Sequence, residues 1–97
     1  MLAGAIEADI VDPRGKTSIE VLGVGLPVQR VSGEFACEVF LPGTQKPTLI
    51  FGEDSLQALC LALSVLRKSV ENLSSLGWKF YYRSSTEQYC FNAYFAS

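Results

Sequence analysis

The first half of the chain alternates between apolar and polar residues in the manner of half-buried β-strands. The clearest case is residues 34–41, where Phe35, Cys37 and Val39 share one side of the predicted strand. We predict an antiparallel meander of about four strands within residues 1–52. Its strands cover residues 3–11, 17–26, 34–41 and 48–51.

Turn sequences separate these strands. Asp12-Pro13-Arg14-Gly15 suits a type I turn, and Leu41-Pro42-Gly43-Thr44 suits a type II turn with proline and glycine at its centre. Gly23 and Gly25 lie within the second strand, where glycine often marks a bend or bulge. Pro27 is expected to end the pairing of that strand, because proline has no amide hydrogen.

The apolar period changes to 3.6 residues after Asp54, which predicts a helix within residues 53–76. Asp54 and Gln57 have the spacing of a capping box, and Gly77 is a suitable stop. We expect one face of this helix to pack on the sheet. The residues predicted to form that stripe are Leu56, Leu59, Cys60, Leu63, Leu66, Val70 and Leu73.

The helix is apolar beyond the width that one core contact needs. Ala58, Leu61, Ala62 and Val65 extend the stripe past the usual core-facing arc of roughly 100°. Such a helix is either covered on two sides within the chain or partly buried against another chain. We therefore predict Leu61 and Val65 as interface residues.

Residues 77–97 form an aromatic tail, with eight of the chain's eleven aromatic residues. The alternation of Trp78-Phe80-Tyr82 and of Tyr89-Phe91-Ala93-Phe95 favours a second hairpin, and a short final helix is the alternative. Tyrosine and tryptophan suit both a core and an interface. In the interface interpretation, the contact residues are Trp78, Tyr81, Tyr82, Tyr89 and Tyr94.

Composition adds a problem of surplus apolar material. The 97 residues are 48% apolar and 19% charged, which excludes a disordered tail or a coiled-coil rod. One domain of this size, residues 1–97, buries only about two thirds of the surface of its unfolded chain. We expect the surplus to be covered by a second copy in a homodimer, or by another protein.

Charge argues against a nucleic-acid partner. Residues 1–54 carry eight acidic and four basic side chains, and residues 55–97 carry four basic and two acidic ones. No basic stripe exists to neutralise several phosphates. The longest apolar run is far shorter than the roughly 20 residues of a membrane span, and Met1–Val11 lacks the basic flank of a signal peptide. We therefore expect no nucleic acid, no membrane and a cytoplasmic location.

Candidate chemistry is sparse. The chain has no histidine, and its three cysteines are widely spaced, so the sequence predicts no metal site. Gly23-Val24-Gly25 lacks the third glycine of a dinucleotide loop. Without histidine, Cys37 lacks its usual activating base. We predict no cofactor and no catalytic residue, so the chain is not expected to be an enzyme.

The run Phe51-Gly52-Glu53-Asp54-Ser55-Leu56-Gln57-Ala58-Leu59-Cys60-Leu61-Ala62-Leu63 resembles the signature of a family of small uncharacterised bacterial proteins. Members of that family carry Gly-x-Asp-Ser-x-Gln-Ala-Leu-x-Leu-Ala-Leu at the start of a helix that follows several strands. The resemblance covers roughly residues 5–70. It implies a bacterial protein with a sheet followed by a helix, and it implies no activity.

These observations favour an α+β fold and a non-catalytic binding or interaction module. Two alternatives stay open. The first is an immunity protein that blocks a bacterial toxin, since small proteins of this kind often lie among toxin–immunity genes and an acidic first half suits a basic partner. A small enzyme or ligand-binding domain would need a pocket with convergent polar groups.

Overall fold

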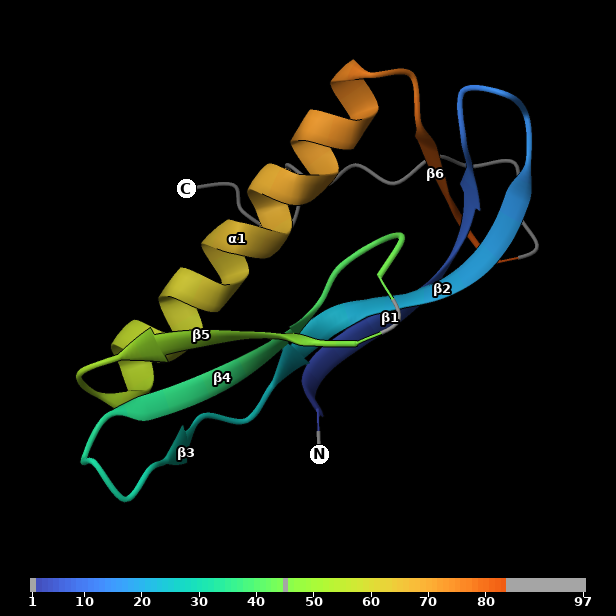
Figure 1. The fold of residues 1–97 in the computed structure, drawn as a ribbon. Coiled ribbons are helices and arrows are strands. Elements are labelled where there is room, and N and C mark those ends of the chain that lie inside the picture. Colours follow the sequence, from blue (N-terminus) through green and yellow to red (C-terminus); the bar gives the residue numbers. More distant parts are fainter. Residues whose placement is uncertain (1, 45, 84–97) are drawn as a thin grey trace.

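The computed structural model describes residues 2–44 and 46–83. They form an α+β fold, in which one helix lies along one face of an antiparallel sheet (Figure 1). The elements are β1 (Leu2–Val11), β2 (Thr17–Gly25), β3 (Val28–Gln29), β4 (Phe35–Phe40), β5 (Thr48–Gly52), α1 (Ser55–Ser75) and β6 (Lys79–Tyr82).

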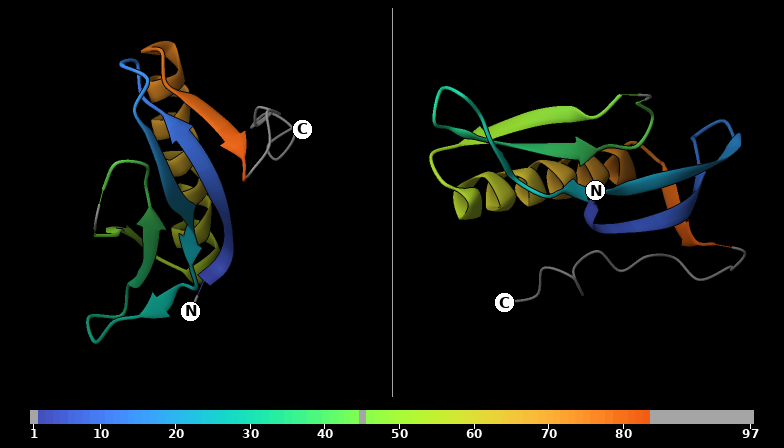
Figure 2. Two further views of the ribbon diagram at one scale, coloured as in Figure 1. Left: turned by 90° about the vertical axis from the view of Figure 1, so that its right-hand side faces the viewer. Right: turned by 90° about the horizontal axis from the view of Figure 1, so that it is seen from below.

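The predicted meander of four strands is confirmed as β1, β2, β4 and β5, and the sheet adds β3 and β6. β4 pairs with β5 along one side and with β2 and β3 along the other. Pro27 ends β2 as predicted, but pairing resumes at Val28, so β3 continues along the same side of β4. After α1, the chain returns to pair β6 with β1 at the opposite margin (Figure 2).

The turn between β1 and β2 depends on Asp12. Its Oδ1 accepts hydrogen bonds from the amides of Arg14 and Lys16, each at 2.9 Å. The Gly15 amide donates to the Asp12 carbonyl oxygen at 2.9 Å, which closes the predicted turn. Gly15 has φ of +90°, a value that glycine adopts without steric cost. The turn therefore sets the register of the β1–β2 hairpin.

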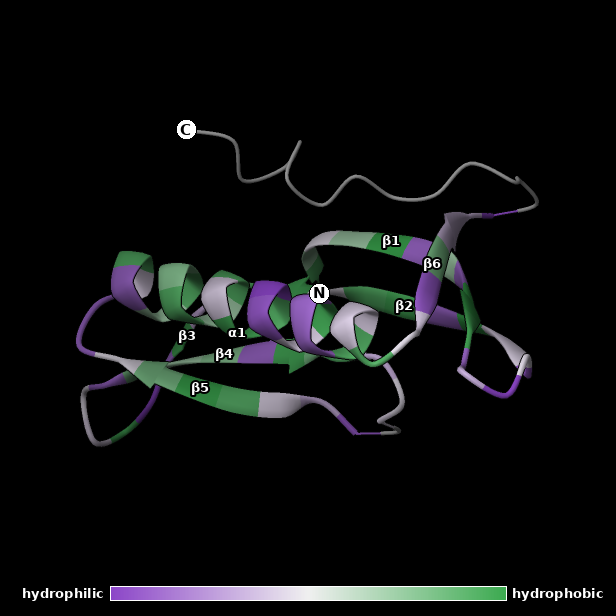
Figure 3. Cartoon of the chain, turned by 90° about the horizontal axis from the view of Figure 1, so that it is seen from above, coloured by the Kyte–Doolittle hydropathy of each residue, from purple (hydrophilic) through white to green (hydrophobic). Residues whose placement is uncertain are grey.

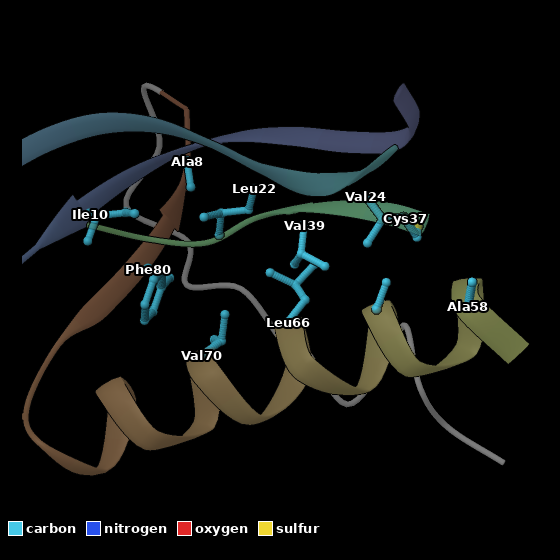
Figure 4. Close-up of a cluster of buried hydrophobic side chains, with 11 residues drawn as sticks. Ala8, Ile10, Leu22, Val24, Cys37, Val39, Ala58, Leu66, Val70 and Phe80 are labelled. Atoms are coloured by element: carbon cyan, nitrogen blue, oxygen red, sulfur yellow. The ribbon is translucent and has the colours of Figure 1, made fainter. Parts of the chain in front are cut away.

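The core lies between the sheet and α1 (Figure 4). Alternate residues of the long strands point toward the helix. The largest fully buried side chains there are Ile10, Leu22, Val39 and Cys37. Each buried aliphatic side chain contributes roughly 1.5–3 kcal/mol through removal from water. The cluster consists of Ala8, Ile10, Leu22, Val24, Cys37, Val39, Ala58, Ala62, Leu66, Val70 and Phe80.

The buried stripe of α1 differs from the predicted one. Leu56 and Cys60 were expected in the core, but both are exposed, and Ala58 and Ala62 take the buried positions. The physical reason is close approach at Gly52. A Cβ atom on Gly52 would lie 2.8 Å from the Ala58 Cα, so only small residues fit where the helix meets the sheet. The larger side chains of Leu56 and Cys60 point away from this contact.

Gly23 is the second position where backbones approach closely. It lies opposite Ala5 in the β1–β2 register, and a Cβ atom on it would lie 2.8 Å from the Ala5 Cα and would overlap the Gly4 carbonyl oxygen. Gly4 itself has open space, since a Cβ atom there would meet nothing within 4 Å. A larger side chain is therefore expected to fit at Gly4 but not at Gly23.

We predict that Gly23→Ala lowers the free energy of unfolding by about 1–3 kcal/mol, because the new methyl group forces β1 and β2 apart. Gly4→Ala is the matched control, with a change within about 0.5 kcal/mol. Urea denaturation followed by circular dichroism measures both. Equal stability of the two variants would contradict the close packing at Gly23.

Candidate interaction surface

The face of the sheet opposite α1, called the outer face below, carries exposed apolar side chains. Strand geometry places them there, because successive residues point to opposite faces. On β2, Leu22 and Val24 point toward the helix, so Ile19 and Val21 point outward. The pairing with β1 supports this assignment of faces. Val21 lies opposite Glu7, which is exposed, and the buried Leu22 lies opposite Ile6, which packs against the core.

Five of these outward residues have large exposed fractions and are called the apolar strip below. Phe51 lies opposite Ala36, which on its other side lies opposite Val28, so one apolar row crosses β5, β4 and β3. Figure 3 shows that β5 is apolar along most of its length. The strip consists of Ile19 (58% exposed), Val21 (44%), Val28 (64%), Leu49 (45%) and Phe51 (46%).

Charged side chains flank the strip at the end near β5. The Arg30 guanidinium lies over the Phe51 ring, 5.5 Å from its centroid. Such a cation–π contact contributes about 0.5–1 kcal/mol at an exposed site. Glu38 is exposed and lies opposite Leu49 in the β4–β5 register. This end of the outer face therefore combines an apolar centre with charges of both signs.

A second charged group joins β6 to β1 at the other margin. An Arg83 nitrogen lies 2.9 Å from Asp9 Oδ1, and another lies 3.4 Å from Glu7 Oε2. The hydrogen bond to Asp9 is the main reason that the pKa of Arg83 is raised above its usual value. Beside this group lies an open hollow of about 550 Å³. Its described lining residues are Leu2, Ala5, Ile6, Glu7, Val21 and Arg83.

Polar groups capable of chemistry are few in residues 2–44 and 46–83. Within these ranges no polar or charged residue is buried, and no group of three carboxylate or cysteine side chains could hold a metal ion. Across the same ranges, no helix is long and apolar enough to cross a membrane. What the described surface offers a partner is apolar area bordered by ion pairs.

Cys37, weighed above as a nucleophile, lies in the core. Its thiol donates a hydrogen bond to the Gly25 carbonyl oxygen at 3.2 Å. Burial, followed by the negative charge of Glu38, raises the pKa of the Cys37 thiol. Because the thiolate is the reactive form, this environment makes Cys37 less reactive. Cys60 is exposed on α1.

The residues predicted as an interface do not lie on one surface. Leu61 is 44% exposed and Val65 is half-buried on α1, on the helix side of the molecule. Trp78 packs against the core. Tyr81 lies opposite Asp9 and Tyr82 opposite Ala8, so these neighbours point to opposite faces of the sheet. Tyr89 and Tyr94 lie outside the described residues.

Sequence reasoning missed the apolar strip, although its signal is present. The segment Ile19–Val24 is apolar on both sides, since Ile19 and Val21 alternate out of phase with Leu22 and Val24. We interpreted Gly23 and Gly25 in this run as a bend or bulge, and the β1–β2 register does shift between Leu2 and Gly4, opposite Gly25 and Val24. β2 nevertheless continues to Gly25, and its apolar residues lie on both faces.

The predicted cap residues lie at the start of α1. Asp54 Oδ1 accepts a hydrogen bond from the Gln57 amide at 2.7 Å. Gln57 Oε1 accepts from the Glu53 amide at 2.6 Å, one residue before the position that a capping box uses. These contacts satisfy backbone groups at the helix end, so they have a structural role.

Comparisons with protein-family models, curated proteins and solved structures find no match for this chain. The resemblance to a family of uncharacterised bacterial proteins therefore stays a prediction.

We predict that iodoacetamide modifies Cys60 but not Cys37 in the folded Cys90→Ser variant, which leaves only these two thiols. Burial and the raised pKa of Cys37 both slow its alkylation. Mass spectrometry of peptides measures the two sites, with urea-unfolded protein as the control in which both react. Similar rates at both thiols in the folded protein would contradict the buried position of Cys37.

Proposed function

We propose that this chain is a non-catalytic protein-binding module and that the outer face of its sheet is the binding surface. The observation that carries the proposal is the apolar strip. Its side chains stay in water although the core on the other face is closed. Apolar area removed from water contributes about 25 cal/mol per Å², so covering the strip favours association.

The shape and charge of the outer face favour a protein partner. A strand face is broad, and it packs well against another sheet or the apolar side of a helix. Arg30 at one end and Glu7, Asp9 and Arg83 at the other can orient a partner without strong attraction, because the two signs are interspersed. We expect a partner with a complementary apolar strip of its own.

Binding is favoured over catalysis by the state of the polar groups near the hollow. Glu7 and Arg83 line it, but they are paired with each other at 3.4 Å, and Arg83 also binds Asp9. These ion pairs connect the end of β6 to β1. The remaining described lining residues are apolar, which suits contact with a partner's side chains.

We predict that a photo-cross-linking amino acid at Val21 captures a protein in cells of the source organism, whereas the same group at Lys68 on α1 does not. The captured protein is then purified and titrated with this chain. Val21→Lys is expected to weaken its binding at least about tenfold, because a charge enters the apolar contact.

Leu61→Lys is the matched control, since Leu61 has the same exposed fraction as Val21 but lies on α1. It is expected to leave the affinity unchanged. The proposal fails if Val21→Lys binds as tightly as the unmodified chain, or if Leu61→Lys alone loses binding.

A further inference from the structure

β5 is a margin of the sheet with one side open. It pairs with β4 from Thr48 to Gly52, and among residues 2–44 and 46–83 no strand pairs with its other side (Figure 1). An edge strand presents unpaired N–H and C=O groups, which form a template for another strand. The open side of β5 therefore offers backbone hydrogen bonds as well as apolar side chains.

This edge lacks the usual protection within the strand. Natural edge strands avoid unwanted pairing through charged side chains, proline or a bulge. The sequence Thr-Leu-Ile-Phe-Gly of β5 contains no charge and no proline, and its pairing with β4 runs without a register shift. Both margins have charged residues beside the strand, with Lys46 and Glu53 beside β5 and Arg83 after β6, but β6 also carries a charge within the strand, Lys79. The contrast singles out β5.

We propose that β5 pairs in antiparallel fashion with β5 of a second copy of this chain, with Ile50 at the two-fold axis. The two sheets then form one continuous sheet, with both outer faces on the same side. The inference goes beyond the proposed function, because it uses the edge of the sheet and leaves Ile19, Val21 and Val28 free for a partner.

The side chains of β5 are self-complementary in this register. An outward residue can only lie opposite an outward residue, so Leu49 lies opposite the partner's Phe51 and Phe51 opposite the partner's Leu49. Both side chains are nearly half exposed in the single chain. Aromatic–aliphatic cross-strand pairs contribute roughly 0.2–1 kcal/mol each. The pairing joins apolar side chains and opposes no like charges.

Charges at the ends of the strand favour the same register. Lys46 precedes β5, and Glu53 and Asp54 follow it. In this register the basic end of each β5 lies near the acidic end of the partner's β5, and the symmetry repeats this at the other end. Exposed pairs add little affinity, but they select between registers.

The occupant is a second copy, because two antiparallel β5 strands place the exposed Leu49 of each beside the exposed Phe51 of the other. Five residues on each side form a small contact, in the size class of weak and transient interfaces. The dimer is therefore expected at high protein concentration. Joining the sheets doubles the apolar strip on one side of the assembly, which increases the area available to a partner.

Sedimentation equilibrium of the full chain across the micromolar range tests the proposal. Leu49→Lys and Phe51→Glu are each expected to raise the dissociation constant of the dimer at least about tenfold. The double variant is expected to have a lower dissociation constant than either single variant, because each new ammonium group lies opposite a new carboxylate across the axis. This recovery is specific to the register about Ile50.

Val21→Lys is the matched control, since Val21 has nearly the same exposed fraction as Leu49 on the same face but lies away from the edge. It is expected to leave the dimer intact, and circular dichroism confirms that each variant is folded. The proposal is overturned by a monomer at all concentrations or by a double variant no better than the single ones. Dimer loss in Val21→Lys would point to face-to-face packing, and loss in Leu61→Lys to the helix, and each would overturn it.

Partner binding and dimerisation have separate measurements. Val21→Lys changes only the outer face, whereas Leu49→Lys changes both the outer face and the edge, so partner binding is judged from Val21→Lys and self-association from Leu49→Lys. If the captured partner binds normally while Leu49→Lys leaves self-association unchanged, the edge proposal fails and the proposed function stands.

Discussion

The arrangement of the molecule depends on the close contact between α1 and one face of the sheet. Gly52, Ala58 and Ala62 allow the helix backbone to approach the strands, and Leu66 and Val70 then fill the space farther along. One helix can cover only one face of a sheet. Within the described residues, the contact that builds the core therefore also determines which apolar side chains stay outside it.

The outer face and the β5 edge follow from this constraint. Strand alternation sends every second residue away from the helix, so an apolar residue at such a position has no place in the core. Ile19, Val21, Leu49 and Phe51 occupy these positions. Part of the apolar surplus is thereby located on this outer face, which is bordered by the ion pairs of Arg83 with β1, whereas Leu56, Leu61 and Leu76 are exposed on or just after α1.

Local sequence signals predict much of this fold. Alternation identifies β1 and β4, the Asp12 and Pro42 turns identify their connections, and the 3.6-residue period identifies α1, because each signal depends only on neighbouring residues. Contacts between distant residues were not predictable in this way. The pairing of β6 with β1 joins Phe80 to Ile10, and the rotation of α1 depends on Gly52. The apolar strip was missed for a different reason, because its signal, apolar residues on both faces of β2, is present in the sequence.

The central claim is that the outer face lies open to solvent while the opposite face is closed by α1. Methyl NMR of the monomeric chain with a soluble paramagnetic agent tests it most directly. The account predicts strong relaxation of the Ile19, Val21 and Leu49 methyl groups and weak relaxation of those of Ile10, Leu22 and Val39. Protection of both sets in the monomer would show that the chain covers its own outer face, and would contradict the account.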